Sequence, residues 1–291
     1  MRGAARLLRY VWTHPLNEHA RLAALGRVLY WQLRSRAGAA AVPLPFVDRT
    51  RLLATRGMHG ATGNWYCGLH EAAEMAFALH LLRPGDLFVD AGANIGSYTV
   101  LAAGAAGARV LAVEPVPQTF ARLQANIRHN ALDGRVRACA IGLWDAPGRL
   151  RFSTDRGTEN RVVEAGDGTP VDVPVARLDD LLGNEAPLLI KIDVEGHELA
   201  VLRGAPRCLA EPRLQALIVE TDAARGLADD VEVVRGVLAD AGFRPFRYDF
   251  RARRLEPETA DRRNVLMIRD AAWVADRLGQ APHFRLVNGW V

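Results

Sequence analysis

The sequence predicts an α/β protein with a doubly wound, mostly parallel sheet. Three observations lead to this prediction: short apolar runs recur along the chain, longer helical patterns separate them, and two of the runs end in an acid before a glycine turn. The helical patterns are amphipathic, so the helices can cover both faces of such a sheet. A helical and hairpin appendage is expected in residues 1–59, and a short tail in residues 271–291.

The composition is that of an ordinary globular protein. The chain has 291 residues, which is enough for one large domain with an appendage, and it is 49% hydrophobic and 24% charged. Its apolar runs stay below the ~18 residues that a membrane span needs, and no secretory signal pattern follows the basic start. The three cysteines fit neither a disulfide framework nor a metal knuckle. We therefore expect a cytoplasmic protein without a membrane span.

The charge pattern does not indicate a nucleic-acid-binding protein. The net charge of +4 is modest. Among the 37 basic residues Lys191 is the one lysine, which indicates a coding bias more than a surface adapted to phosphate. Arginines gather at residues 247–263, but no aromatic RNA-binding module accompanies them. A solvated hairpin rim is the simpler explanation of these arginines, and we expect no nucleic-acid partner.

The first predicted helix covers residues 17–36. Leu22, Leu25, Leu29 and Leu33 lie on one stripe of this helix, and arginines occupy other positions. A basic amphipathic helix can lie on a membrane, pack on a partner or cap the main domain. We expect it to cap the main domain, and the same arm could form a homo-oligomer interface.

The segments that follow lead from the appendage to the main domain. Prolines interrupt the helical pattern at residues 43–45, which marks a boundary, and residues 46–58 suggest two strands or a hairpin. Residues 60–71 are predicted to be a glycine-rich loop with aromatics, a histidine and an acid, which could cover a cofactor or only connect the two parts. A helix over residues 72–82 then precedes the first buried strand. The main domain is expected to span residues 60–270.

The most informative stretch is residues 87–96, in which three apolar residues and Asp90 run into a glycine turn that opens a helix. Gly92 and Gly96 let the backbone approach a ligand closely, and Asn94 tolerates positive φ. Ligands of open α/β sheets bind at the carboxyl ends of such strands. The turn is therefore predicted to be part of a ligand site, although an ordinary strand-to-helix turn is the alternative.

Two acids favour S-adenosylmethionine over a dinucleotide as this ligand. A dinucleotide-binding turn has glycine at the middle position, where this chain has Asn94. Asp90 would repel a pyrophosphate but suits a cationic ligand that carries an amino group. Glu114 follows the next apolar run, at residues 109–113, and is placed to accept hydrogen bonds from a ribose diol.

The rest of the chain continues the alternation of strands and helices. The predicted elements are a helix over 117–130, a strand over 135–143, a hairpin at 149–152, a loop over 154–170, a strand over 188–192, a helix over 199–209, a strand over 214–220, a helix over 229–242, and an antiparallel pair of strands over 243–250 and 264–268.

Three motifs in this order resemble those of the FkbM family of S-adenosylmethionine-dependent methyltransferases: residues 90–96, Glu114–Pro115, and residues 191–198. The resemblance covers about residues 60 to 250. It implies a Rossmann-like, seven-stranded sheet, mostly parallel with an antiparallel edge strand. It also implies O-methylation of a small-molecule hydroxyl on a sugar, polyketide or other natural product. An RNA methyltransferase and a non-catalytic assembly protein are the alternatives.

The resemblance also implies a cofactor site. The glycine turn would surround the methionine part of S-adenosylmethionine, the acid after the second strand would hold the ribose, and residues near the end of the third strand would meet the adenine. The residues assigned in this way are Asp90, Gly92, Ala93, Asn94, Gly96, Glu114, Pro115, Ile141 and Asp193.

Candidate catalytic residues follow the strand at residues 188–192. Asp193 is expected to lie nearest the transferred methyl group. The candidates for the base that removes the hydroxyl proton are Asp193, Glu195, His197 and Glu198. His197 suits this role because histidine titrates near neutrality. Glu195 and Glu198 could instead be first-turn acids that face a helix dipole.

The same residues could bind a divalent metal, but we do not expect one. Asp193, Glu195 and His197 are all metal-ligand types. Alternating positions along a bending chain rarely converge on one ion, however. Lys191 lies in the preceding strand and is expected to pair with Asp193 or Glu220, because a buried charge needs a partner.

Overall fold

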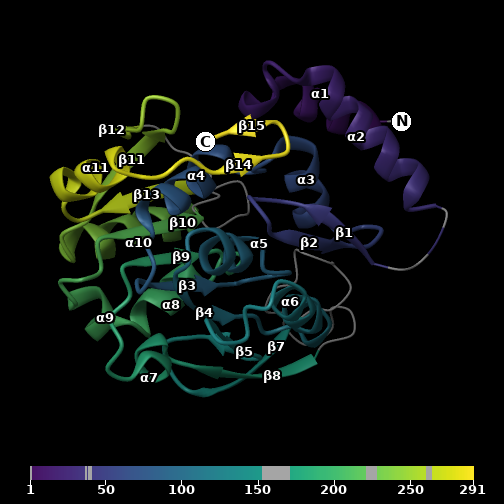
Figure 1. Cartoon of the computed structure of the whole chain (residues 1–291). Helices are drawn as coiled ribbons and strands as arrows, with labels where there is room; N and C mark the ends of the chain where they lie inside the picture. The colour runs from purple at the N-terminus through teal and green to yellow at the C-terminus, as the bar shows by residue number, and fades with distance from the viewer. Residues whose placement is uncertain (1, 37, 39–40, 153–170, 221–227, 260–263) are drawn as a thin grey trace.

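One eight-stranded sheet forms the centre of the computed structural model, which describes residues 2–36, 38, 41–152, 171–220, 228–259 and 264–291. The expected loop over 154–170 lies outside these residues. The strands run in the order β12-β11-β13-β10-β9-β3-β4-β5 (Figure 1). Their bounds are β3 (Leu87–Ala91), β4 (Arg109–Val113), β5 (Val136–Cys139), β9 (Leu189–Ile192), β10 (Ala216–Glu220), β11 (Arg244–Asp249), β12 (Arg254–Pro257) and β13 (Asn264–Ile268).

The predicted doubly wound, mostly parallel sheet is confirmed, and its strand count is larger by one. Strands β5, β4, β3, β9 and β10 are parallel neighbours, whereas β13 runs antiparallel to β10 and β11. The expected antiparallel pair is thus β11 and β13, with β13 inside the sheet. The extra strand is β12, which pairs antiparallel with β11 at the edge. The sequence of β12, RLEP, lacks the apolar run by which the other strands were predicted.

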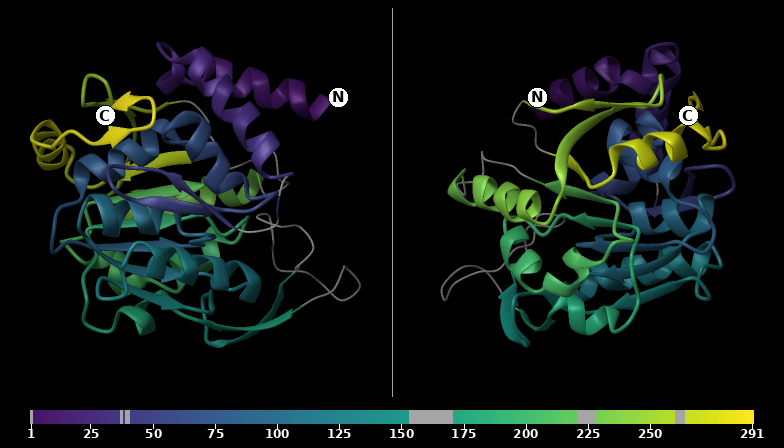
Figure 2. Two further views of the ribbon diagram at one scale, coloured as in Figure 1. Left: turned by 45° about the vertical axis from the view of Figure 1, so that its right-hand side comes forward. Right: turned by 90° about the vertical axis from the view of Figure 1, so that its left-hand side faces the viewer.

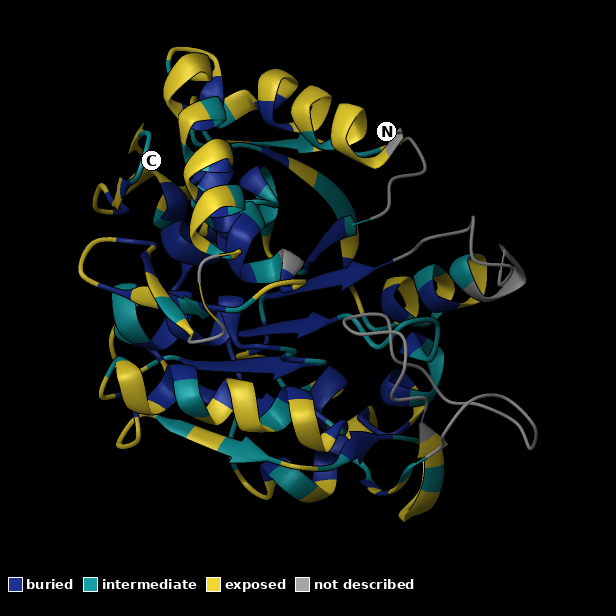
Figure 3. Ribbon diagram, turned by 90° about the vertical axis from the view of Figure 1, so that its right-hand side faces the viewer, coloured by how far each residue is buried: buried dark blue, intermediate teal, exposed yellow. Residues whose placement is uncertain are grey.

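Two layers of helices cover the two faces of the sheet, as the burial colouring in Figure 3 shows. Because side chains alternate along a strand, Phe88 packs into one core while Leu87 and Val89 pack into the other. The first layer consists of α4 (Ala72–Leu81), α5 (Ser97–Val100) with the π-helical turn η2 (Leu101–Ala105), α6 (Pro117–His129) and α11 (Ala271–Gly279). The second layer consists of α7 (Leu178–Leu182), α8 (Glu198–Arg203), α9 (Pro206–Ala210) and α10 (Ala228–Asp240).

Two predicted elements are divided in the structure. The strand expected over 135–143 is β5 followed by β6 (Gly142–Leu143), which joins a separate sheet with β7 (Gly148–Phe152) and β8 (Val171–Ala176). The helix expected over 199–209 is α8 and α9. The break falls at Gly204, where a Cβ atom would lie 2.2 Å from the carbonyl oxygen of Trp144.

The glycine-rich segment at residues 60–71 was predicted to be a loop, and that prediction is wrong. Residues His59–Cys67 form helix α3. Glycines are poor helix formers, but here they allow close packing. A Cβ atom at Gly60 would meet the Ile95 side chain at 3.4 Å, and one at Gly63 would meet His70 at 3.2 Å. The helix ends at Gly68, whose φ is 84°.

The amino-terminal appendage contains more helix than expected. Helix α1 (Arg2–Thr13) and the short turn η1 (Pro15–Asn17) precede α2 (Arg21–Arg34), so the single helix predicted over 17–36 begins later. The predicted hairpin is present as β1 (Val42–Pro45) and β2 (Arg51–Ala54), and β1 includes the prolines that were expected to lie at a boundary.

The carboxyl-terminal segment packs back on the domain. Helix α11 lies against α4, where the Arg277 Nε donates a hydrogen bond to the Leu81 carbonyl at 2.7 Å. A hairpin of β14 (Arg285–Leu286) and β15 (Gly289–Trp290) follows. Its turn residue Asn288 donates to the carbonyls of Leu16 at 2.7 Å and Cys67 at 2.8 Å, so this turn ties the arm to α3. Within the described part of the chain, no helix has both the length and the apolar character to cross a bilayer.

Candidate active site

The site is built where β3, β4, β9 and β10 reach the same edge of the sheet. The turn after β3 is fixed to the neighbouring strand, because the N–H groups of Gly92 and Ala93 both donate to the Val113 carbonyl, at 3.0 and 2.9 Å. Gly92 has a φ of 77°, and a Cβ atom there would lie 1.9 Å from the Asp193 carbonyl oxygen. Only glycine therefore lets the β3 and β9 ends approach in this way.

The same turn opens helix α5. Asn94 has a φ of 51° and donates its backbone N–H to Glu114 Oε2 at 2.9 Å. Gly96 has a φ of 92°, and a Cβ atom there would lie 2.6 Å from Leu123 Cδ1. Asn94 and Gly96, both with positive φ, thus bend the chain sharply beside two acids, Asp90 and Glu114.

Asp90 is 1% exposed at the end of β3. Its Oδ2 accepts a hydrogen bond from Thr99 Oγ1 at 2.6 Å, and its Oδ1 is buried without a hydrogen-bond partner among the described residues. Burial raises the pKa of Asp90, although the nearby Lys191 charge and the Thr99 hydrogen bond oppose the shift. A buried, incompletely bonded carboxyl of this kind favours a hydrogen-bonding, cationic ligand group.

Glu114 is the second acid and lies after β4. Its Oε1 accepts the Val116 N–H at 2.9 Å, and its Oε2 accepts the Asn94 N–H. Burial raises the pKa of Glu114 to about 7, because the two backbone hydrogen bonds only partly compensate for the loss of water. A carboxylate has about four lone-pair sites, so acceptor capacity remains for two ligand hydroxyls.

Lys191 is the central cation of the site. Its Nζ lies 2.8 Å from Asp193 Oδ2 and 5.0 Å from the centroid of the Tyr98 ring. Burial works against the charge of Lys191, but the carboxylates of Asp193, Asp90 and Glu71 outweigh burial and raise its pKa. The expected pairing with Asp193 is confirmed.

Glu71 reaches this network from the α3–α4 junction. Its Oε2 accepts a hydrogen bond from the Tyr98 hydroxyl at 2.7 Å, and its Oε1 accepts one from Asn264 Nδ2 at 3.1 Å. Burial opposes the charge of Glu71, but His70 and Lys191 hold its pKa below the usual range. Glu71 thereby connects the segment before the sheet with α5, β9 and β13.

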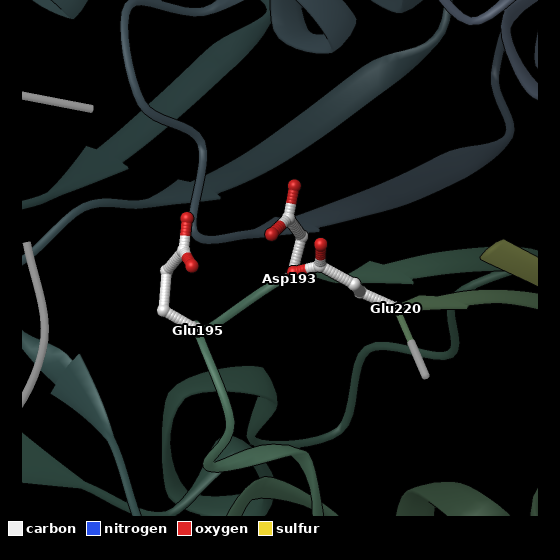
Figure 4. A group of neighbouring side chains, drawn as sticks. All are labelled: Asp193, Glu195 and Glu220. Atoms are coloured by element: carbon white, nitrogen blue, oxygen red, sulfur yellow. The ribbon is translucent and has the colours of Figure 1, made fainter. Parts of the chain in front are cut away.

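A cluster of three acids lies beside this network. Asp193, Glu195 and Glu220 each offer a carboxylate oxygen, and these oxygens lie within 4.8 Å of one another. Figure 4 shows the three side chains facing one another at the ends of β9 and β10. Glu195 reaches this position with a φ of 56°. The cluster could hold a divalent cation, because such ions prefer carboxylate oxygens.

His197 lies apart from that cluster. It precedes α8, and its ring lies against Trp144 with centroids 5.2 Å apart. Of the three residues that the sequence offered as possible metal ligands, Asp193 and Glu195 belong to the cluster, whereas Glu220 takes the place of His197. Glu198 Oε1 accepts the N–H groups of Gly196 at 3.1 Å and Val194 at 3.3 Å, so it stabilises its own turn.

The remaining residues assigned to the cofactor lie close to the strand ends. Ala93 is buried within the glycine turn, and Pro115 is half-buried between Glu114 and Val116. Ile141 is partly buried between β5 and β6 and packs on the second core.

Sequence reasoning did not single out Thr99, Tyr98 or Asn264. The first two follow the glycine turn directly, so a search of the first turn of α5 could have found them. Asn264 stands opposite Glu220 because β13 is antiparallel to β10, a pairing without a local signal.

The sequence of this chain is similar to those of known methyltransferases. Residues 90–245 match the model of the methyltransferase FkbM domain. The chain is 34% identical over 147 residues to "Methyltransferase 1" of Beauveria bassiana, an alignment covering 42% of this chain and 59% of that protein. It is 30% identical over 190 residues to "31-O-demethyl-FK506 methyltransferase FkbM" of Streptomyces tacrolimicus, covering 53% of this chain and 73% of that one.

A solved structure, methyltransferase FkbM from Methylobacillus flagellatus, aligns with 21% identity and a TM-score of 0.45 over 71% of this chain and 54% of that chain. The family match covers more than half of the 291 residues and includes the glycine turn, Asp90, Glu114 and the β9 end. The chain therefore belongs to the FkbM family of methyltransferases.

Proposed function

We propose that this methyltransferase uses S-adenosylmethionine and methylates a hydroxyl of a small molecule, such as a sugar, polyketide or other natural product. One observation carries the proposal: two buried acids, Asp90 and Glu114, flank a glycine turn at adjacent strand ends. The name of the Streptomyces relative, a 31-O-demethyl-FK506 methyltransferase, supports an oxygen acceptor on a natural product.

The residues fit this cofactor better than a dinucleotide. The unpartnered Asp90 Oδ1 suits the amino group of the methionine part, directly or through a water. Glu114 suits the ribose hydroxyls because its carboxylate is already oriented by two backbone N–H groups. A pyrophosphate would face two buried acids at this edge, and the repulsion would be strong in a poorly hydrated site.

Asp193 is proposed to receive the acceptor hydroxyl. Its side chain is 33% exposed beside the glycine turn, and Lys191 holds it at 2.8 Å. When bound, S-adenosylmethionine supplies the methyl group on a positively charged sulfur. Asp193 would orient the hydroxyl toward that group and accept its proton, with His197 and Glu195 as the other candidate bases.

The arginines near the carboxyl end do not favour an RNA acceptor. Arg247 and Arg254 face Glu256, and the Arg253 guanidinium donates to the carbonyls of Ala281 and Pro282. These contacts build the β11–β12 edge, so these arginines are not arranged as a phosphate-binding row.

Transfer of an isotopically labelled methyl group tests the function. The full chain would be incubated with methyl-labelled S-adenosylmethionine and a panel of hydroxylated sugars and polyketides, with and without EDTA. We expect a product whose magnetic resonance signal is that of an oxygen-bound methyl, formed equally in EDTA because Lys191 already supplies the positive charge beside Asp193. A nitrogen- or carbon-bound methyl would contradict O-methylation, and loss of activity in EDTA would assign a metal to the acidic cluster.

Cofactor affinity should depend on pH through Glu114. The pKa of Glu114 in the free protein is about 7, and its ionised form is the better acceptor for ribose hydroxyls. The ionised fraction rises between pH 6 and pH 8, so the affinity for S-adenosylhomocysteine should rise by about tenfold over this range and then level off. Calorimetric titration at several pH values measures this effect.

The control for this prediction is Glu114→Gln, checked for folding by its unfolding temperature. The amide cannot ionise, so the variant should bind more weakly at pH 8 and lose most of the pH dependence. An unchanged pH dependence in Glu114→Gln would place the titrating group elsewhere.

A further inference from the structure

We propose that the amino-terminal arm, residues 2–36, is a docking surface for a membrane that contains anionic lipids. The arm lies at one end of the molecule, outside the sheet and its helices, in each view of Figure 2. This inference goes beyond the methyl-transfer reaction and concerns where the enzyme works.

Helix α2 has two apolar sides, and only one of them packs on the protein. Ala24, Val28 and Trp31 are buried against the domain. Within the predicted leucine stripe, Leu25 is partly buried against the core. The other three leucines face solvent: Leu22, Leu29 and Leu33 are 78%, 61% and 62% exposed. Their spacings of seven and four residues return to the same side of a helix.

Other apolar side chains of the arm are also exposed. Leu8 and Trp12, one helical turn apart on α1, are 46% and 42% exposed, and Tyr30 of α2 is 50% exposed. Arg21 stacks over the Trp12 ring at 5.3 Å, which joins the end of α1 to the start of α2. Leucines with a tryptophan and a tyrosine are the composition of interfacial helices, whose aromatic rings lie at headgroup level.

The charge of the arm identifies the partner. Residues 1–46 contain seven arginines and a single acid, Glu18, which is paired with Arg251 at 2.5 Å. The exposed arginines of the arm are Arg6, Arg9, Arg21, Arg34 and Arg36. Such a surface is complementary to anionic headgroups, where each arginine strengthens binding by about fivefold.

A second copy of the chain fits this surface less well. A symmetric dimer would place the same positive surface against itself, so that arginine would face arginine across the interface. The arm has no acidic side chain other than Glu18 to relieve that repulsion. A membrane with anionic lipids can bury the exposed leucines and pair with the arginines at the same time.

The arm is fixed to the domain, so docking would orient the whole enzyme. The Tyr10 hydroxyl donates to the His70 carbonyl at 2.8 Å, and Asn17 Nδ2 donates to the Tyr66 carbonyl at 3.2 Å. His70 precedes Glu71, which belongs to the charge network of the active site. The surface that meets the lipid is thus connected to the segment beside the active site.

Co-sedimentation of the full chain with vesicles tests the proposal. We expect binding to vesicles of equimolar phosphatidylglycerol and phosphatidylcholine, much weaker binding to pure phosphatidylcholine, and a decrease with added salt. The triple variant Leu22→Ser, Leu29→Ser, Leu33→Ser should lower the partition coefficient by at least about tenfold, and Arg34→Gln alone by about fivefold. No cofactor is needed, so the result does not depend on the proposed reaction.

The matched control is Val233→Ser on α10, which removes another exposed apolar side chain, 45% exposed, far from the arm in the sequence. It should bind vesicles like the wild type, and circular dichroism should show that all variants fold. Failure of the wild type to bind anionic vesicles would overturn the proposal. So would a wild-type dimer that the triple serine variant converts to a monomer while vesicle binding is unchanged.

Discussion

Lys191→Met is expected to lower the free energy of unfolding by about 3 kcal/mol at pH 8, because it leaves Asp193, Asp90 and Glu71 without their shared buried cation. Methionine has nearly the same length, so the effect reports the lost charge and not a cavity. Urea unfolding followed by circular dichroism measures the change. The control is Arg109→Met, which breaks an exposed ion pair with Glu185 and should cost less than about 1 kcal/mol.

The free energy of unfolding that Lys191→Met loses relative to the wild type should be larger at pH 8 than at pH 5. Lys191 lowers the pKa of Asp90, so its removal raises this pKa further above the unfolded-state value of about 4. An acid with a raised folded-state pKa stabilises the fold fully below its unfolded-state pKa and loses that contribution as the pH rises through the folded-state pKa. If the variant loses the same free energy of unfolding at both pH values, or less at pH 8, the positive charge of Lys191 does not stabilise these carboxylates.

Asp193→Asn should lower kcat by about 10²–10⁴-fold, because an amide keeps the shape of the side chain but cannot accept the hydroxyl proton. The affinity for S-adenosylhomocysteine should change by less than about tenfold, since Asp90 and Glu114 make the principal proposed contacts with the cofactor. Initial rates in the labelled-methyl assay and calorimetric titration separate the two effects.

His197→Gln is the comparison for this variant. His197 lies against Trp144, whereas Asp193 lies beside the glycine turn and Lys191. We therefore expect a rate loss of less than about tenfold for His197→Gln. A larger loss in His197→Gln than in Asp193→Asn would make the histidine the base.

The strands that carry the site were predictable from local sequence. Residues 87–89 and 110–113 are apolar because both faces of a parallel strand are buried, and the acids that follow them, Asp90 and Glu114, fall at the same edge of the sheet. The glycine turn was predictable for a similar reason, because Gly92 and Gly96 adopt positive φ at points of close approach.

Features that depend on tertiary packing were not predictable in this way. Helix α3 contains two glycines, Gly60 and Gly63, which pack closely against Ile95 and His70. Helix α2 has apolar residues at helical spacing on two of its sides, and the sequence alone does not say which side packs on the domain. The contact of Glu71 with Asn264 joins residues 193 positions apart through an antiparallel strand order that no motif encodes.

Calorimetric titration of the wild-type chain and of Asp90→Ala with S-adenosylhomocysteine tests most directly whether the buried acids form the cofactor site. The predicted result is one site per wild-type chain, no detectable binding by Asp90→Ala, and no binding of NAD by either. Absence of binding to the wild type, or equal affinity in a folded Asp90→Ala variant, would contradict the assignment of the site.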